Sequence, residues 1–437
     1  MKVFGLAVGL LVYWVGLVHA ANPRPFENAY FQGVTDKNPV GYHVGEEIVF
    51  TLVLKDAEAF PDDSYFLKWT AMADDDTRLT GTVSLIRGKP FVHRGKIGNP
   101  GFYGLRVDVV DRDGNPYQRL DGTRFNTKSV TFRGGAAADP DKMKTAAEPA
   151  DFDVFWERRR ARLTQCRGEV RRTTVRSPDP KVDVWAVQIP CAGPRPVTGH
   201  LSIPRCHDGG LPAELTLDGY GDGARRHELP PISVPLDRIV LHINAHGYEL
   251  GREDEYYRQF AESIKSNGKL YAHDPEQNRD PEKSYFSGMS FRVMCALEFL
   301  SRLPEWNRRD LWTSGSSQGG LQALWGAALD SRVTRCTVQV PWCCDLGGVT
   351  LHRFRGGQVP WVEALAYYDP VFLARRIPRT CFVDIARVGL GDPTSPPSSI
   401  GVLWNNLRCP ARIVWVQGSD HGFVPPEPRQ EIEWTRK

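Results

Sequence analysis

Several features that define other protein classes are missing from this sequence of 437 residues. No block of Lys and Arg residues stands out, and the formal net charge is only +3, whereas a nucleic-acid-binding surface needs a basic stripe. The sequence contains neither a CxxC pair nor an HExxH motif, so a zinc site has little support. Beyond the first twenty residues, no stretch is long and apolar enough to cross a bilayer. We therefore expect no nucleic-acid partner, no metal and no stable membrane association of the mature chain.

The first twenty residues have the pattern of an export signal. Lys2 is followed by an apolar run from Val3 to Val18, which is shorter than the roughly 20 residues that a spanning helix needs. Short side chains at Val18 and Ala20 fit a signal-peptidase site. We predict a signal peptide over residues 1–20 and a secreted or periplasmic protein; the alternative is an uncleaved membrane anchor.

Cysteine is absent from the first third of the chain, and all nine cysteines lie from Cys166 onward. Because their number is odd, at least one thiol is free or pairs between chains. Cys166, Cys191 and Cys206 are candidate disulfide partners. Cys295 lies in a helical apolar pattern and is predicted to be a small buried residue.

The sequence divides into two predicted domains. Residues 21–133 contain short alternating segments, such as the apolar positions Ile48, Phe50, Leu52 and Leu54, which have the period of a half-buried strand. A strong turn signal follows at Asp111–Gly114. Regular short strands of this kind predict an immunoglobulin-like β-sandwich without the cysteine pair of true immunoglobulin domains. Residues 134–149 are rich in Gly, Ala and Pro, lack periodicity and are predicted to be a linker.

Residues 150–437 alternate between strand-like and helix-like segments. Apolar strand segments are predicted at 183–189, 197–203, 213–217, 238–243, 310–313, 333–340, 381–388 and 411–416. Helical patterns are predicted at 286–303 and 319–329. This alternation predicts an α/β domain with a mostly parallel sheet covered by helices.

The segment Gly315–Gly319 matches the pattern G-x-S-x-G, which is a weak signal alone. Its context is stronger, because a strand runs into it and a helix runs out of it, as in the nucleophile turn of an α/β-hydrolase. The glycines allow a strained serine backbone and close packing of helix on strand. We predict that Ser317 is the nucleophile; the alternative is an ordinary glycine-rich turn.

A serine nucleophile needs a base, and in this fold the chain order is serine, acid, histidine. Only His352 and His421 follow Ser317, and His352 precedes the later strands. His421, in a loop directly after a predicted strand, is therefore the predicted base.

The acid should end the preceding strand and orient the imidazole. Asp392 follows the segment 381–388 and meets this requirement. Asp384 lies inside that strand, and Asp420 is adjacent to the histidine and badly placed to reach its ring. Asp392 is therefore the predicted acid.

A tetrahedral intermediate also needs two backbone N–H donors. One should come from Gln318, directly after the nucleophile. The other should come from a loop after an earlier strand, and two loops compete, Asp218–Gly221 and His246–Tyr248. The first follows the segment 213–217 in the expected place, so we assign the donor to Tyr220.

The second domain resembles a known group, the acetyl xylan esterases and cephalosporin-C deacetylases of carbohydrate esterase family seven. The matching pieces are FDVFW at Phe152–Trp156, DGYG at Asp218–Gly221, GSSQGG at Gly315–Gly320, VPWCCD at Val340–Asp345, Tyr368–Asp369, GLGD at Gly389–Asp392 and Pro396–Pro397. The resemblance implies hydrolysis of acetyl groups from oligosaccharides or polysaccharides without a metal or cofactor. It implies the same nucleophile, acid, base and oxyanion donors as those assigned above.

Two positions depart from the family pattern. Asp218 stands where the family usually has a histidine, and Gly422 follows the predicted base where the family has a glutamate. Two alternatives to a carbohydrate acetyl esterase remain: a broad short-chain carboxylesterase or serine peptidase on the same fold, and a non-catalytic glycan-binding protein.

Overall fold

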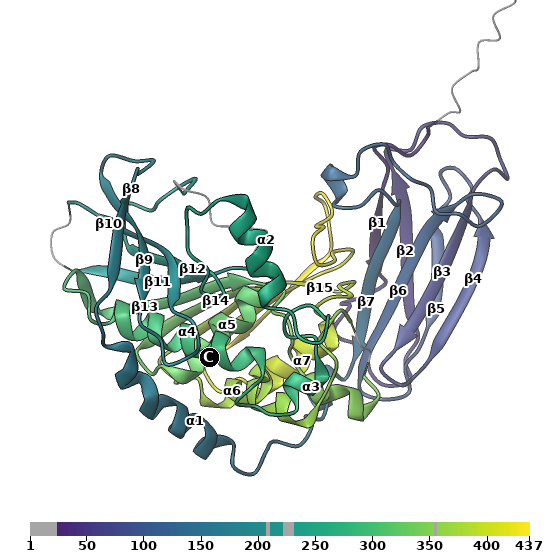
Figure 1. The fold of residues 1–437 in the computed structure, drawn as a ribbon. Helices are drawn as coiled ribbons and strands as arrows, with labels where there is room; N and C mark the ends of the chain where they lie inside the picture. The colour runs from purple at the N-terminus through teal and green to yellow at the C-terminus, as the bar shows by residue number, and fades with distance from the viewer. Residues whose placement is uncertain (1–23, 207–209, 222–230, 354–355) are drawn as a thin grey trace, which may run out of the picture.

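The computed structural model describes residues 24–206, 210–221, 231–353 and 356–437, which form two lobes side by side (Figure 1). The first lobe is built mainly from strands, and the second combines strands and helices. The predicted signal peptide, residues 1–20, lies outside the described residues. Within the described residues, no helix is long and apolar enough to cross a membrane.

The β lobe consists of two antiparallel sheets with a common core. The three-stranded sheet has the order β1 (Tyr30–Thr35), β2 (Ile48–Lys55), β5 (Phe91–Gly95). The four-stranded sheet has the order β4 (Arg78–Ser84), β3 (Phe66–Ala73), β6 (Gly101–Val110), β7 (Thr131–Ala138). The alternating residues of β2 and β6 that point inward are almost fully buried in one cluster. The predicted all-β fold of this part is confirmed, because period-2 burial on both sheets creates the shared core.

The predicted linker, residues 134–149, is partly wrong, because its first five residues continue β7 to Ala138. Ala136, Ala137 and Ala138 are fully buried. Small residues here allow a close approach between backbones, so the Gly and Ala content reflects tight packing rather than a flexible connection. The following residues contain a short 3-10 helix, η2 (Pro140–Lys142), and the buried Met143.

The α/β lobe is built on a ten-stranded sheet. Its order is β17 (Glu431–Arg436), β16 (Ala411–Val416), β15 (Phe382–Gly389), β14 (Val333–Gln339), β13 (Trp306–Ser316), β11 (Leu211–Leu217), β12 (Ile239–Ile243), β10 (Val197–Pro204), β9 (Val182–Ile189), β8 (Arg171–Val175). The six neighbouring strands β16, β15, β14, β13, β11 and β12 pair in parallel. Antiparallel strands flank them on both sides. The predicted α/β class with a mostly parallel sheet is confirmed.

The helices of this lobe pack around the sheet. They are α1 (Phe152–Ala161), α2 (Asp254–Ser263), α3 (Pro275–Asn278), α4 (Tyr285–Leu300), α5 (Gln318–Leu329), α6 (Pro370–Leu373) and α7 (Pro397–Asn406). Short 3-10 helices lie at η3 (Arg162–Cys166), η4 (Leu346–Leu351), η5 (Glu363–Tyr368) and η6 (Ala374–Arg376). Helices α4 and α5 contact each other and both contact β11, so they cover the same face of the sheet. Nearly every side chain of α5 is buried, because the helix lies between the sheet and its helical neighbours.

The two lobes meet where β7 lies against loops of the α/β lobe. The Gly135 N–H donates to Gln417 Oε1 (3.0 Å), and Gln417 Nε2 donates back to the Gly135 carbonyl (2.8 Å). A Cβ atom on Gly391 would lie 2.1 Å from the carbonyl carbon of Arg133. In Figure 1 the yellow C-terminal loops of the α/β lobe reach the strands of the β lobe. The exposed edge that β7 would otherwise have is thus covered by a side chain and by close backbone packing.

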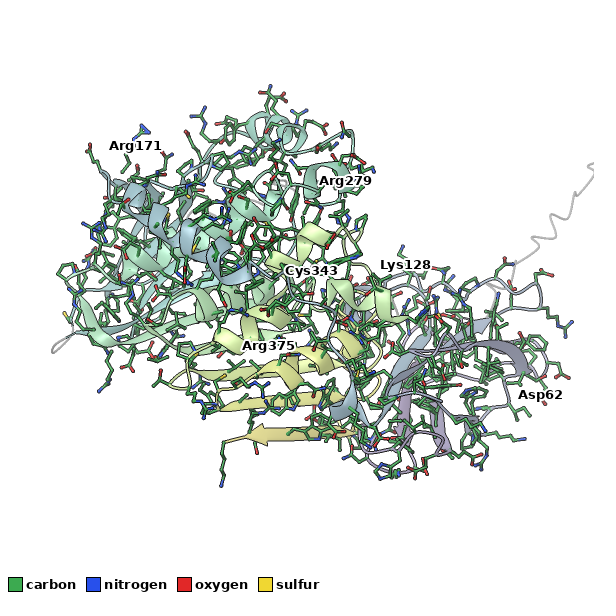
Figure 2. All side chains as sticks on the ribbon, turned by 90° about the horizontal axis from the view of Figure 1, so that it is seen from below. Asp62, Lys128, Arg171, Arg279, Cys343 and Arg375 are labelled. Atoms are coloured by element: carbon green, nitrogen blue, oxygen red, sulfur yellow. A yellow bond between two sulfur atoms is a disulfide. The ribbon has the colours of Figure 1, made fainter. Side chains whose placement is uncertain are left out.

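One prediction about cysteines is wrong: Cys295 is not unpaired but forms a disulfide with Cys166, with a Cα–Cα distance of 5.7 Å. Cys166 ends η3, which packs against α4, where Cys295 lies. The two residues are 129 positions apart, so spacing alone could not reveal their contact. Cys191, Cys206 and the remaining five cysteines, all in described residues, form no disulfide. Among them Cys343 lies deep in the molecule, whereas Asp62 and Arg171 lie toward the outer ends of the two lobes (Figure 2).

Substitution of Gly391 tests the contact between the lobes. We expect Gly391→Ala to lower the thermal unfolding midpoint, because its Cβ would overlap the Arg133 backbone and overpacking costs about 1–3 kcal/mol. The control is Gly104→Ala in β6, whose Cβ would approach no atom closer than 3.7 Å. Equal midpoints for the two variants in thermal unfolding followed by circular dichroism would contradict the packing described above.

Candidate active site

The turn between β13 and α5 holds Ser317 in a strained conformation. Its backbone has φ 57° and ψ −119°, a region that a residue with a side chain rarely adopts and that costs about 1–3 kcal/mol. The Ser317 N–H donates to the Gln339 carbonyl (3.0 Å), and the Ser317 carbonyl accepts from the Trp342 N–H (3.0 Å). A Cβ on Gly315 would lie 2.4 Å from the carbonyl carbon of Gly319, so the turn can be this sharp only with glycine. The sequence therefore presents the Ser317 hydroxyl at the end of a central strand.

The His421 imidazole lies between the predicted nucleophile and the predicted acid. Its Nε2 is 2.9 Å from Ser317 Oγ, and its Nδ1 is 2.8 Å from Asp392 Oδ2. A carboxylate only accepts, so Nδ1 carries the proton and Nε2 accepts from the serine hydroxyl. The structure thus brings together three side chains that are far apart in the sequence. They arrive from the ends of β13, β15 and β16, which lie at the same edge of the parallel sheet.

The Asp392 carboxylate is fully buried and completely hydrogen-bonded. Its Oδ1 accepts the N–H groups of Thr394 (2.8 Å) and Ser395 (2.9 Å), which leaves Oδ2 for the imidazole. The Ser395 hydroxyl in turn donates to the Val340 carbonyl (2.9 Å), beside the serine turn. A fixed carboxylate of this kind holds one tautomer and one orientation of the ring.

The two aspartates that the sequence reasoning set aside have other partners. Asp384 is buried within β15 and pairs with Arg412 through both oxygens (3.0 and 3.1 Å). Asp420 Oδ1 accepts the N–H groups of Gly422 (3.0 Å) and Phe423 (2.8 Å), so it shapes the loop that carries the histidine.

Arg387 is a residue of this site that the sequence reasoning missed. It lies in β15 and donates to the carbonyl oxygens of Asp420 (3.0 Å) and His421 (3.2 Å). Burial lowers the pKa of its guanidinium, and the nearby Asp392 and Asp420 charges oppose that shift. Arg387 therefore ties the strand that precedes the acid to the loop of the base. A lone arginine in a strand gives no sequence signal for such a role.

The loop Asp218–Gly221 lies directly beside the serine turn. In the sheet Leu217 is opposite Gly315, and a Cβ on Gly319 would lie only 2.1 Å from the Leu217 carbonyl oxygen. Gln318 is the first residue of α5, where backbone N–H groups have no acceptor within the helix. The predicted donors, Tyr220 and Gln318, are thus on neighbouring segments at the edge of the sheet that carries Ser317.

Tyr271 connects these two segments and was also missed from the sequence. Its hydroxyl donates to Gln318 Oε1 (2.8 Å) and accepts the Gly221 N–H (3.1 Å), while its ring stacks on Tyr220 at 4.4 Å between centroids. It stands in a loop between α2 and α3 without regular periodicity, so only the folded chain shows its position.

The loop His246–Tyr248, the other candidate for the second oxyanion donor, supports the loop Asp218–Gly221. His246 Nε2 lies 2.5 Å from the Gly221 carbonyl oxygen and must donate to it, so Nδ1 accepts from the Tyr285 hydroxyl (2.7 Å). Burial lowers the pKa of His246 to about 3, which keeps the ring neutral. Asp218, the departure from the family pattern, has its Oδ1 at 2.6 Å from His242 Nε2.

Within the described part of the chain, no group of three or more His, Cys, Asp or Glu side chains is arranged to ligate a metal ion.

Comparisons with known proteins agree with this fold. The family model of acetyl xylan esterase matches residues 141–356. The acetyl esterase Axe7A of Xylanibacter ruminicola is 26% identical over 380 residues, which cover 82% of this chain and 79% of that protein.

Two solved structures are similar in fold. The acetyl xylan esterase from Paenibacillus sp. R4 has a TM-score of 0.52 at 22% identity, covering 65% of this chain and 94% of that chain. Acetyl xylan esterase 1 from Thermoanaerobacterium sp. JW/SL YS485 has a TM-score of 0.52 at 18% identity, covering 66% of this chain and 93% of that chain.

Together these likenesses define the class: the protein is a carboxylic ester hydrolase of the α/β-hydrolase type. Within that class, residues 141–356 match the acetyl xylan esterase family, which confirms the resemblance inferred from the motifs.

The buried His246 predicts a dependence of stability on pH. The ordinary pKa of histidine is 6.5 and burial lowers it here to about 3. Between these values the unfolded chain binds a proton that the folded chain does not, so stability falls as the pH falls, by up to about 1.4 kcal/mol per pH unit.

We expect His246→Gln, which keeps an amide donor for Gly221 but does not titrate, to have a shallower profile. The measurement is urea unfolding at several values between about pH 7 and about pH 4.5. The control is His352→Gln, at an exposed ring paired with Asp76, which should keep the wild-type slope. A wild-type slope in His246→Gln would rule out this origin of the pH dependence.

Proposed function

We propose that the protein removes acetyl groups from carbohydrates, with Ser317 as nucleophile, His421 as general base and Asp392 as the acid that orients it. The single observation that carries this proposal is the hydrogen-bonded chain from Asp392 Oδ2 through the imidazole to Ser317 Oγ, at 2.8 and 2.9 Å. A serine hydroxyl is a poor nucleophile until a base at this distance can take its proton. Acetylated carbohydrates are the proposed substrates because residues 141–356 match the acetyl xylan esterase family.

In the first half of the reaction, Ser317 Oγ attacks the acetyl carbonyl carbon while its proton passes to His421 Nε2. The negative charge that develops on the carbonyl oxygen is stabilised by the N–H groups of Tyr220 and Gln318. The intermediate collapses by breaking the bond to the sugar oxygen, which takes the proton from the imidazolium. The products are the free sugar hydroxyl and acetyl-Ser317.

In the second half, water attacks the acetyl-Ser317 carbonyl and gives a proton to His421 Nε2. The second intermediate collapses with loss of Ser317 Oγ, which recovers the proton from the imidazolium, and acetate leaves. The buried Asp392 stabilises the imidazolium in both halves without changing its own protonation. No step requires a cofactor from outside the chain.

The proposal also includes the organisation of the chain. We assign residues 21–133 to a β-sandwich domain and residues 150–437 to the catalytic domain, joined by residues 134–149, of which the first five extend β7. We assign the action of the enzyme to the outside of the cell or the periplasm, because the pattern over residues 1–20 is that of an export signal.

Alanine substitutions of the two adjacent serines, Ser317 and Ser316, test the identity of the nucleophile. We expect Ser317→Ala to lower kcat/KM for p-nitrophenyl acetate by at least about 10⁴-fold, because the oxygen that forms the acyl-enzyme bond is then missing. Ser316→Ala, which changes the exposed neighbouring serine, is the matched control and should remain close to wild type. Undiminished hydrolysis by Ser317→Ala would overturn the mechanism.

A panel of substrates tests the reaction class. We expect hydrolysis of p-nitrophenyl acetate and release of acetate from acetylated xylo-oligosaccharides. Hydrolysis of p-nitrophenyl octanoate should be much slower, and a peptide p-nitroanilide should be untouched. Comparable rates on the octanoate would indicate a broad carboxylesterase, cleavage of the anilide would indicate a peptidase, and inactivity on every ester would indicate a protein that binds glycans without hydrolysing them.

A further inference from the structure

A cavity between the two lobes opens beside the histidine of the proposed triad. Its volume is about 250 Å³, and one wall is formed by the loop of residues 420–423 with His421 itself. The opposite wall comes from the β lobe, from β6, β7 and the segment around the 3-10 helix η1 (Thr123–Phe125). Sites for drug-sized ligands are about 300–1,000 Å³, so this space suits one sugar unit.

The β-lobe wall is rich in arginine. Arg106, Arg119 and Arg133 line the cavity, whereas Asp420 is the only carboxylate among its lining residues. The charge of Arg106 is neutralised locally, because its guanidinium pairs with Asp108 two residues along the strand (2.8 and 3.0 Å).

Arg119 adds further positive charge to the wall, because no carboxylate in the described part of the chain is hydrogen-bonded to it. Its Nη atoms donate to the carbonyl oxygens of Ala29 and Ser129, and its guanidinium lies 4.1 Å from the centre of the Phe125 ring. Burial lowers its pKa to about 10, so it stays charged at neutral pH.

Arg133 is the arginine whose donors are available. Among the described residues, none accepts a hydrogen bond from its guanidinium, and the nearest carboxylate oxygen, Asp420 Oδ2, is 3.9 Å from Nε. The other oxygen of Asp420 is engaged with the N–H groups of its own loop. The side chain is about 29% exposed, so a solute in the cavity can reach it.

We propose that this cavity binds the carboxylate of a uronic acid unit carried by the acetylated glycan, with Arg133 as the residue that pairs with it. The planar guanidinium offers parallel N–H groups that match a carboxylate, which a neutral sugar lacks. Because the cavity wall includes His421, the acidic sugar would neighbour the unit that carries the acetyl group. This inference rests on the proposed function and specifies its substrate class as an acidic acetylated glycan.

The test uses two substrates that differ only in charge. One is an acetylated xylo-oligosaccharide with a glucuronic acid branch, and the other is the same compound after reduction of the carboxyl group to an alcohol. We expect the wild-type enzyme to favour the acidic substrate at least about tenfold in kcat/KM, which corresponds to about 1.4 kcal/mol. Raising NaCl from about 0.02 to about 0.5 M should weaken this preference, because salt screens a partly exposed pair.

Substitutions of Arg133 test whether this residue causes the preference for the acidic substrate. Arg133→Gln should reduce the ratio of the two kcat/KM values to about one, and Arg133→Lys should retain part of it, because the charge remains without the planar fork. Arg94→Gln is the matched control: this β-lobe arginine is exposed and pairs with Glu47, away from the cavity lining. It should keep both rates and their ratio.

Each other outcome has a defined meaning. A wild-type enzyme that hydrolyses p-nitrophenyl acetate without preferring the acidic glycan would overturn the proposal and leave the proposed function intact. Inactivity on every ester would overturn the proposed function itself. An equal loss on both glycans in Arg133→Gln, with an unchanged ratio, would show that the Arg133 side chain supports the structure of the site without recognising the carboxylate, and would also overturn the proposal.

Discussion

The close approach of the first turn of α5 to the end of β11 is the constraint on which the rest of the site depends. Gly319 allows it, since a Cβ there would lie 2.1 Å from the Leu217 carbonyl oxygen. This contact places the strained turn of Ser317 against the loop that follows β11. Tyr271 then bridges the two segments by hydrogen bonds on both sides. Because the backbone is tightly packed at Gly319, the serine hydroxyl and the neighbouring N–H groups have fixed relative positions before substrate binds.

The acid and the base depend on a second contact, which comes from the other lobe. Gln417 precedes the histidine loop and exchanges two hydrogen bonds with Gly135 of β7, while Gly391 precedes the acid and packs on the Arg133 backbone. Arg387 joins the same loops from within β15. The loops of both residues are therefore braced by a strand that lies outside the α/β sheet. Preorganisation of a catalytic site requires such support, because an imidazole displaced by one ångström loses much of its effect.

The sequence was most informative where function depends on chain order and local pattern. Strand-turn-helix context around Ser317 and the position of Asp392 and His421 after strands are local properties, and the structure brings these three side chains within hydrogen-bonding distance. The class of each lobe followed from period-2 and alternating patterns. Contacts between distant segments were not predictable: Tyr271 and Arg387 carry no motif, and the Cys166–Cys295 disulfide joins residues 129 positions apart. The run Gly134–Ala138 was misinterpreted because small residues mark both flexible linkers and tightly packed strands.

The bracing by β7 has a consequence for how such a chain can evolve or be engineered. An appended module that only binds glycans can be exchanged or deleted without touching the reaction of its neighbour. Here removal of the β lobe would break both hydrogen bonds between the Gln417 side chain and Gly135 and expose Trp415, whose ring contacts Phe102 of the β lobe at 5.6 Å between centroids. The two lobes must therefore be inherited together. A recombinant enzyme without the β lobe would need a designed replacement for the contacts that β7 makes.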